Sequence, residues 1–277
     1  MKFTVLGSGS TGNAVLISGG GTNVLVDAGM SAREILRRIA VAGVDPEDLD
    51  GILVTHEHGD HIGGLRVLLR SVKCPVFISR ETEDAYYSTR KIGANGAAEG
   101  IKRRDALHPR AIAIESDAEF RIGEIDFEPF SVPHDAADNF GFVARRDGVR
   151  IATLMDFGRF TPLITQKLAG CDAIIVESNH SLDMLRACPV YSWELKQRIA
   201  SDTGHLSNES LAEWLTEGFD GTARHIVLAH LSQRANDPSL ARLMAESALR
   251  SRETVLSAKT EIGISDHKTP TEWIEIG

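Results

Sequence analysis

The segment Thr55-His56-Glu57-His58-Gly59-Asp60-His61 gathers three imidazoles and a metal-binding carboxylate between residues 56 and 61. It includes the end of the apolar stretch 51–55, which has the composition of a buried strand, and it precedes leucines at helical spacing. Neutral imidazole and carboxylate groups are ligands of zinc, manganese and iron, and a tight loop can direct alternate side chains at two neighbouring ions. A surface histidine tract is the alternative, but the order of strand, cluster and helix argues against it.

Further potential ligands follow the later predicted strands. They are His134 after 130–133, Asp156 after 152–155, Glu177 after 173–176 and His230 after 226–229. Each has an ordinary alternative as a surface or turn residue. Because strand ends converge on one rim of a layered fold, we expect these groups to meet the first cluster. Taken together, the loop and the strand ends offer about seven ligands, which suffice for two divalent ions.

Turn signals predict two hairpins. Gly19-Gly20-Gly21 separates the buried strands 14–17 and 23–26, and Asp147-Gly148 separates 140–145 from 149–154. Capping residues predict helices that begin near Ser31, Ser207 and Asp237. Further strands are expected at 75–79, 111–115, 125–132, 173–176 and 225–228. Early hairpins followed by alternating strands and helices predict an α+β fold, a four-layer αββα sandwich of two mixed sheets flanked by helices.

The composition is that of an ordinary globular protein. The chain has 277 residues, 42% apolar and 25% charged, which excludes disordered, collagenous and coiled-coil classes. No run approaches the roughly 18 apolar residues of a membrane span, so we expect a cytoplasmic protein without a membrane partner. Three widely spaced cysteines without a CxxC pair predict free thiols and no disulfide-linked partner. Neither a monomer nor an oligomer is favoured.

The charge balance bears on a nucleic-acid partner. Lys and Arg total 30 against 39 acidic residues, a net charge of −9, which is the opposite of the usual nucleic-acid binder. A polynucleotide must therefore be met by a local basic patch. The candidates are Arg33, Arg37 and Arg38, then Lys102, Arg103 and Arg104, and finally Arg145, Arg146 and Arg150. Affinity for DNA should rest on the metals and a short basic track.

The ordered set of ligands resembles the metallo-β-lactamase fold. The pattern is Thr55-His-x-His-x-Asp-His61, a spaced histidine, an aspartate shortly before a glycine, and a final histidine. The resemblance implies that His56, His58 and His134 hold one metal, that Asp60, His61 and His230 hold the other, and that Asp156 bridges both. Four motifs resemble those of the YycJ-like (WalJ-like) hydrolases, implied to be DNA exonucleases: 6–13, 177–180, 204–208 and 228–232.

The same resemblance implies a second apparatus beside the metals. In tRNA 3′-processing endonucleases of this fold, a glutamate and a histidine on later loops serve the phosphate, and Glu177 and His205 match them. The predicted catalytic residues are thus Asp60, Glu177 and His205. An imidazolium at His205 can neutralise charge on phosphorus oxygens and protonate the leaving oxygen. The predicted substrate-binding residues are His180, Ser232, Asn236, Ser10 and Asn13. As alternatives, His180 supports a neighbouring site residue, Ser232 and Asn236 cap the helix at Asp237, and Ser10 and Asn13 belong to a Gly-rich turn between two strands.

The spacing of the ligands limits insertions. Only 21 residues separate His134 from Asp156, too few for the tRNA-gripping arm of related enzymes, and 73 separate Asp156 from His230, too few for the inserted domain of RNA-degrading relatives. We therefore expect residues 1–277 to form one domain without an inserted arm or an additional nucleic-acid-binding domain.

The leading hypothesis is a dinuclear metal-dependent phosphodiesterase with zinc or manganese. It would act as an exonuclease on DNA through a metal-bridging hydroxide, with His205 assisting the leaving group. The alternative is a small-molecule hydrolase of the same fold that cleaves a thioester, lactone or cyclic nucleotide. A non-catalytic sensor or scaffold would have lost ligands, and all seven are present.

Overall fold

Two seven-stranded mixed sheets form the centre of the molecule, and the computed structural model describes residues 1–88, 107–252 and 259–277. The first sheet has the order β14 (Ile274–Glu275), β1 (Lys2–Gly7), β2 (Ala14–Gly19), β3 (Thr22–Val26), β4 (Gly51–Leu53), β5 (Val76–Ile78) and β6 (Ala111–Ala113). The second has the order β13 (Glu261–Ile264), β12 (His225–Ala229), β11 (Ala173–Glu177), β10 (Val149–Leu154), β9 (Phe140–Arg146), β8 (Ile125–Ser131) and β7 (Phe120–Ile122).

The predicted hairpins form for the expected reason. Gly20 and Gly21 have φ of 61° and 83°, and Asp147 and Gly148 have φ of 51° and 80°. Positive φ at both central residues gives the turn whose twist matches paired strands. The β2–β3 and β9–β10 pairs are accordingly antiparallel, whereas β3–β4–β5 and β10–β11–β12 are parallel.

Helices lie outside the two sheets, some on their outer faces and others near the strand ends. They are α1 (Ala32–Val41), α2 (Gly59–Ile62), α3 (Leu65–Leu68), α4 (Arg80–Ser88), α6 (Pro162–Leu168), α7 (Leu182–Ala187), α8 (Trp193–Ile199), α9 (Asn208–Glu217) and α10 (Pro238–Ser251). Ser31, Ser207 and Asp237 accept backbone N–H bonds and cap α1, α9 and α10 as predicted. Within the described ranges no helix is long and apolar enough to cross a membrane.

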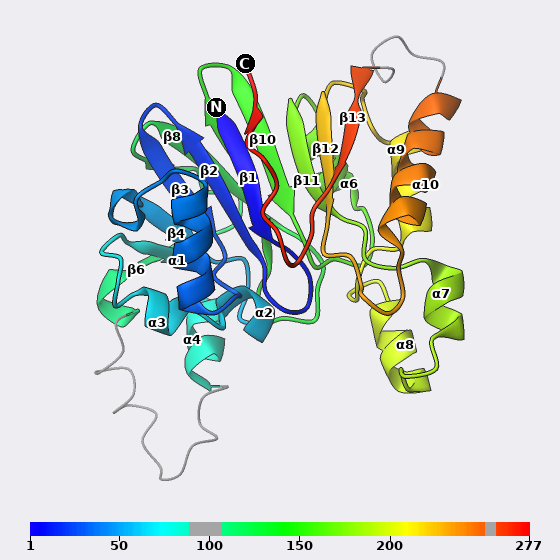
Figure 1. Cartoon of the computed structure of the whole chain (residues 1–277), viewed down its shortest axis with the longest axis horizontal. Helices are drawn as coiled ribbons and strands as arrows, with labels where there is room; N and C mark the ends of the chain where they lie inside the picture. Colours follow the sequence, from blue (N-terminus) through cyan, green and yellow to red (C-terminus); the bar gives the residue numbers. More distant parts are fainter. Residues whose placement is uncertain (89–106, 253–258) are drawn as a thin grey trace.

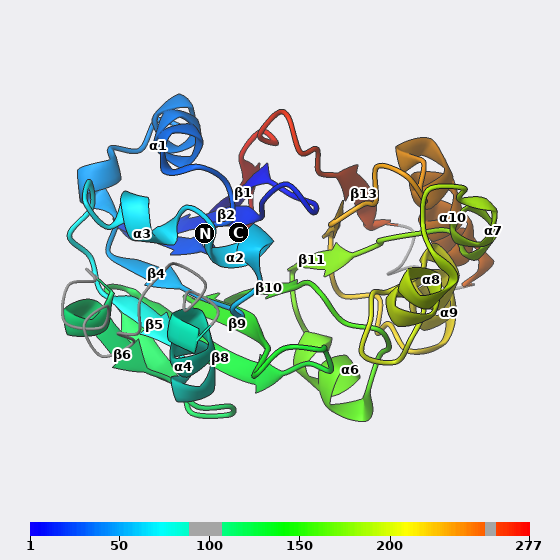
Figure 2. The same ribbon diagram turned by 90° about the horizontal axis from the view of Figure 1, so that it is seen from below.

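Three apolar clusters fill the spaces between four layers. One lies between the two sheets and includes Phe3, Phe127 and Phe142. A second packs α1, α3 and α4 onto the first sheet, and a third packs α6, α9 and α10 onto the second. Figures 1 and 2 show α1 and α10 on opposite outer sides of the paired sheets. The four-layer αββα sandwich predicted from the sequence is confirmed.

The helix expected directly after the histidine cluster is two short helices. Between α2 and α3 lie Gly63 and Gly64, and a Cβ at Gly64 would stand 1.9 Å from the carbonyl oxygen of Met30. Gly64 also donates its N–H to the carbonyl of Ala28 at 2.8 Å. The chain therefore breaks here because the segment after β3 passes too close for a regular helix with side chains.

The three cysteines are buried and unpaired. Burial raises the pKa of the Cys74 and Cys171 thiols to about 11, so both stay protonated at neutral pH. Cys188 is also buried. None of the three lies in the ligand clusters described below.

Candidate metal centre

The histidine loop leaves the carboxyl end of β4 and enters α2, at the lower edge of the strands in Figure 1. The backbone of neighbouring segments holds it in place: Asn13 donates its N–H to the carbonyl of Asp60 at 2.7 Å, and Ala28 donates to that of His61 at 2.7 Å. A Cβ at Gly29 would lie 1.6 Å from the Asp60 carbonyl oxygen, so this contact requires glycine. The histidine loop is thus held in place by the segments that adjoin β2 and β3.

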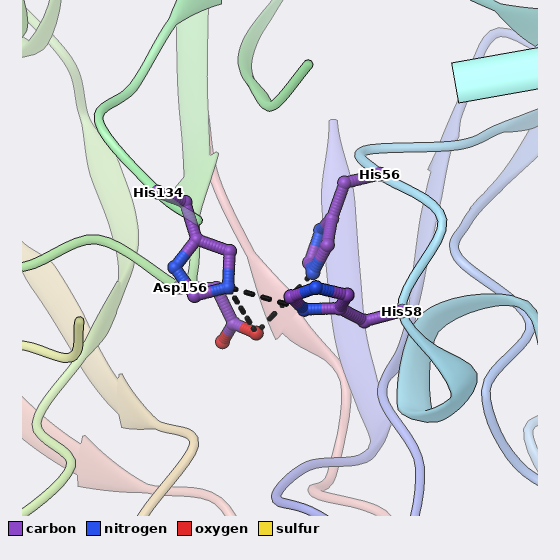
Figure 3. A group of neighbouring side chains, drawn as sticks. All are labelled: His56, His58, His134 and Asp156. Carbon is purple, nitrogen blue, oxygen red and sulfur yellow. Dashed lines mark hydrogen bonds and ion pairs between the residues drawn. The ribbon is translucent and has the colours of Figure 1, made fainter. Parts of the chain in front are cut away.

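His56, His58 and His134 converge on the carboxylate of Asp156, as Figure 3 shows. Their possible ligand atoms all lie within 4.8 Å of one another. Nε2 of His56 is 3.4 Å and Nε2 of His134 is 3.7 Å from Oδ2 of Asp156. Nε2 of His134 and Nδ1 of His58 are 3.2 Å apart.

The protonation of these rings suits a metal. Nδ1 of His134 faces the carbonyl oxygen of Gly204 at 3.1 Å and must carry the proton, which leaves Nε2 as a lone-pair donor toward the site. Nε2 of His56 is buried without a hydrogen-bond partner. Burial, together with the charge of His61, lowers the pKa of His56 to about 3, and burial lowers that of His134. Neutral rings with unused nitrogens are what a divalent ion requires.

A second group adjoins the first through Asp156. It contains Asp60, His61 and Asp156, with Nε2 of His61 3.1 Å from Oδ2 of Asp156. Nε2 of His230 lies 3.4 Å from Oδ2 of Asp60. The structure therefore brings all seven predicted ligands together, and their assignment to two ions stays a prediction.

Buried negative charge makes the centre attract cations. Burial opposes ionisation of Asp156, but His230 and His61 hold its pKa well below the usual range. Burial by itself would lower the pKa of His61 and His230. The neighbouring carboxylates outweigh burial and raise both pKa values well above the usual range. A divalent ion would displace these protons, which couples metal binding to proton release.

Glu177 links two histidines beside this group. Its Oε1 lies 2.8 Å from Nδ1 of His205 and 3.0 Å from Nδ1 of His230, while Oε2 accepts the N–H groups of Phe157 and Leu206. Burial opposes ionisation of Glu177, but the charge and hydrogen bond of His205 lower its pKa to about 2. Conversely, Glu177 raises the pKa of His205 against the effect of burial. Glu177 is therefore a buried carboxylate that orients the His205 ring and favours its protonated form.

His205 faces an open cavity, with 23% of its side chain exposed. This His205 cavity has a volume of about 390 Å³ and is also lined by His58, Asp60, Asp156 and His230. Another part of the lining comes from α8 and from Tyr191, two residues before it: Tyr191, Leu195, Arg198 and Ile199. Nε of Arg198 donates to Asp135, which follows the ligand His134. The sequence analysis missed this wall because α8 carries no motif.

Several site residues adopt left-handed backbone conformations. Asp27, Asp156 and His230 have φ of 63°, 58° and 54°, each just beyond the carboxyl end of a strand. Asp and His tolerate this region better than most residues, at a cost of about 1–2 kcal/mol each. The sharp turns aim the side chains across the rim rather than along the strand.

Comparisons with known proteins agree with this geometry. Residues 22–231 match the family described as Beta-lactamase superfamily domain. Over 272 residues the chain is 34% identical to "Exodeoxyribonuclease YycJ" of Bacillus anthracis, with 98% of each chain covered. The chain belongs to the YycJ-like branch of the metallo-β-lactamase superfamily. It is 32% identical over 275 residues to "Exodeoxyribonuclease WalJ" of Streptococcus pneumoniae serotype 2, with 99% of this chain and 98% of the relative covered.

A solved structure supports the same fold. The metallo-β-lactamase fold protein YhfI from Bacillus subtilis superposes with a TM-score of 0.69 at 16% identity, and 98% of each chain is covered. The membership and the clustered His and Asp ligands make this YycJ-like protein a metal-dependent hydrolase.

Two residues predicted to bind substrate are buried and hydrogen-bonded within this YycJ-like protein, and one of them, Asn236, also lines a cavity with Ser232 and Lys268. Asn13 is fully buried, and its amide donates to Nε2 of His61 at 3.0 Å while its Oδ1 accepts the N–H of Gly9. The amide of Asn236 is buried too and donates to the carbonyls of Ser178 and Asn179. Their hydrogen-bonding groups are used within the protein, so both position the loops that carry site residues.

The other three predicted substrate contacts differ in accessibility. Ser10 is exposed and Ser232 half-buried, and both line the His205 cavity. His180 is buried, neither ring nitrogen has a hydrogen-bond partner, and burial lowers its pKa to about 4. Its carbonyl accepts the N–H of Asn208, which helps to fix the loop that carries His205. The burial of the His180 ring therefore disfavours its direct contact with a substrate.

The basic clusters proposed as DNA contacts are largely paired with acidic groups. Arg37 and Arg38 bind Glu34, Arg145 binds Glu119, and Arg146 binds Asp147. The cluster at 102–104 lies outside the described residues. Within the described chain, Arg198 is the arginine that lines the His205 cavity.

Asp27 is a site residue that the sequence analysis did not identify. It is buried, its Oδ2 accepts from Nδ1 of His61 at 2.6 Å, and both its oxygens accept from Thr55. This bond fixes the proton on Nδ1 and turns Nε2 toward Asp156. An aspartate directly after a buried strand was the available signal.

We expect Asp27→Asn to weaken metal binding by about 10-fold to 100-fold, because His61 loses the charged acceptor that orients its ring. Asparagine tolerates the positive φ of this position, so the backbone needs no rearrangement. Competition with a chromogenic chelator measures the affinity, and thermal unfolding reports folding separately. Unchanged affinity in a folded variant would show that Asp27 does not orient His61.

Proposed function

We propose that this chain is an exodeoxyribonuclease that uses two divalent ions, zinc or manganese. In this proposal His56, His58 and His134 hold one ion, Asp60, His61 and His230 hold the other, and Asp156 is shared. Such ions supply Lewis-acid polarisation of a phosphate oxygen and activate water at neutral pH. The unused nitrogens of His56 and His134 and the shared position of Asp156 support this arrangement.

The observation that carries the proposal is the Glu177–His205 pair at 2.8 Å, placed beside Asp156 and open to the His205 cavity. Because Nδ1 of His205 is bound to Glu177, Nε2 remains for a substrate. From there an imidazolium donates a proton to the leaving oxygen of a phosphodiester and offsets its negative charge. Thioester and lactone hydrolysis has less need of such a proton donor. The names of the YycJ and WalJ relatives, which match over nearly the whole chain, favour DNA.

In the same proposal residues 1–277 form one domain, and DNA reaches the metals without an inserted arm. The three apolar clusters each combine elements from distant parts of the described chain, which favours a single folding unit. Arg198 on the cavity wall is an arginine near the metals, and it is paired with Asp135.

Digestion of 5′-labelled and 3′-labelled DNA tests the proposal. Single- and double-stranded substrates are incubated with manganese or zinc, beside the Asp60→Ala variant as a metal-site control. Release of labelled mononucleotides by the wild type alone is the expected result, and the label position gives the polarity. No cleavage of any strand by protein that binds two ions per chain would overturn it and favour the thioester, lactone or cyclic-nucleotide alternative.

A further inference from the structure

A second cavity adjoins the His205 cavity. Its volume is about 560 Å³, and its lining includes Gln233, Pro238, Ile264 and Lys268, so it is called the Lys268 cavity here. Leu231 and Ser232 line both cavities. The two cavities therefore share the segment that directly follows the predicted ligand His230. Both volumes fall in the roughly 300–1,000 Å³ range of small-ligand pockets.

The far wall of the Lys268 cavity is held by a buried arginine. Arg38 donates through Nη1 to the carbonyl of Leu6 at 2.5 Å and through Nη2 to the carbonyls of His267 and Lys268 at 3.1 Å and 2.8 Å. Ser265 adds hydrogen bonds from its N–H and its hydroxyl to the carbonyl of Leu228. The wall is therefore preformed, since strong donors anchor its backbone to β1 and β12.

The lining suits a nucleotide. Leu231, Pro238 and Ile264 offer apolar surface, and Ser232 and Gln233 offer neutral polar groups. The ammonium group of Lys268 has no ion-pair partner among the residues that the structure describes.

One acidic group also lines the cavity. The carboxylate of Asp266 accepts from the N–H of Lys268 and the hydroxyl of Thr269 and lies 3.0 Å from Nδ1 of His267. Its oxygens are engaged in this turn, and it keeps a negative charge that opposes an incoming phosphate.

We propose that the Lys268 cavity binds the nucleotide next to the one cleaved, with Lys268 on its phosphate. The inference rests on the proposed exonuclease function. The wall of α8 closes one side of the His205 cavity, which leaves room for the terminal nucleotide there. The strand then crosses Leu231 and Ser232 and continues into the Lys268 cavity. Two adjacent cavities that each accept about one nucleotide would favour a strand end over the interior of a duplex.

The test compares the wild type with Lys268→Ala on single-stranded oligothymidylates of two to six nucleotides. We expect the variant to raise KM about fivefold to tenfold, the effect of one lost charge-assisted hydrogen bond at a partly exposed site. The slope of log(kcat/KM) against log salt concentration should become shallower by about 0.7, because one phosphate contact is gone. Lys268→Arg should restore both values. Lys73→Ala is the matched control. Lys73 is exposed and precedes β5, which lies near the β6 edge of the first sheet, whereas Lys268 precedes β14 at the other edge.

Fluorescence anisotropy with labelled oligothymidylates separates this inference from the proposed function. If the wild type cleaves DNA while Lys268→Ala keeps its KM and salt slope, the Lys268 cavity is not a nucleotide site and the exonuclease proposal stands. If the wild type cleaves nothing but binds oligothymidylates with a salt slope that Lys268→Ala reduces, the cavity assignment stands and the catalytic proposal fails. Absence of binding by the wild type overturns both.

Discussion

Asp156→Asn is expected to lower kcat/KM on DNA by about 1,000-fold, if the ions contribute several kcal/mol that depend on this carboxylate. Asp156 belongs to all three clusters of potential ligands, and its charge faces the rings of His61 and His230. An amide keeps the shape but removes the negative charge that two cations would share. Bound metal, measured by elemental analysis after gel filtration, should fall with activity.

The matched control for this variant is Asp147→Asn. Asp147 also has a positive φ, 51°, but it lies in the exposed β9–β10 turn, at the end of β10 opposite Asp156. It should keep wild-type metal content and activity. Full activity and two bound ions in Asp156→Asn would refute the shared-ligand assignment.

His205→Ala is expected to lower kcat on DNA by about 100-fold to 10,000-fold, the usual range for loss of a general acid. Metal content should stay unchanged, because the seven predicted ligands remain. The fall should be much smaller on bis(p-nitrophenyl) phosphate, whose leaving group departs without a proton. Comparison of kcat on the two substrates under the same metal concentration measures the difference.

His225→Ala provides the control for loss of a histidine. His225 begins β12 at the end of the strand opposite His230, and its ring lies 3.6 Å from Glu261. It should retain activity on both substrates. Equal losses on DNA and on the activated ester in His205→Ala would point to a positioning role instead of proton donation.

The candidate metal ligands could be proposed from the sequence because each carries a local signal. Four crowd into one loop, and His134, Asp156 and His230 follow apolar runs with the composition of buried strands. Hairpins were equally visible, since Gly20-Gly21 and Asp147-Gly148 require positive φ that few other residue pairs accept. By contrast β14, which pairs with β1 through Lys2 and Glu275, has only two residues and no periodicity to detect.

The same limit applies to the polar residues. Asn13 and Asn236 have the right chemistry for a phosphate contact, and nothing local shows that both side chains are buried and fully engaged. The basic clusters looked available because their acidic partners are not always adjacent: Arg145 meets Glu119 from another segment.

The sequence by itself determined the donor set, the strand ends that carry it and the layered fold, because these depend on residue type and short-range periodicity. Tertiary structure alone decided which groups meet: Asp27 reaches His61 across 34 residues, and Ser8 accepts the N–H of His230 across 222. It also placed the α8 wall and the Lys268 cavity on either side of Leu231 and Ser232. Such contacts depend on how distant strands pack into two sheets, and no spacing within one segment encodes that.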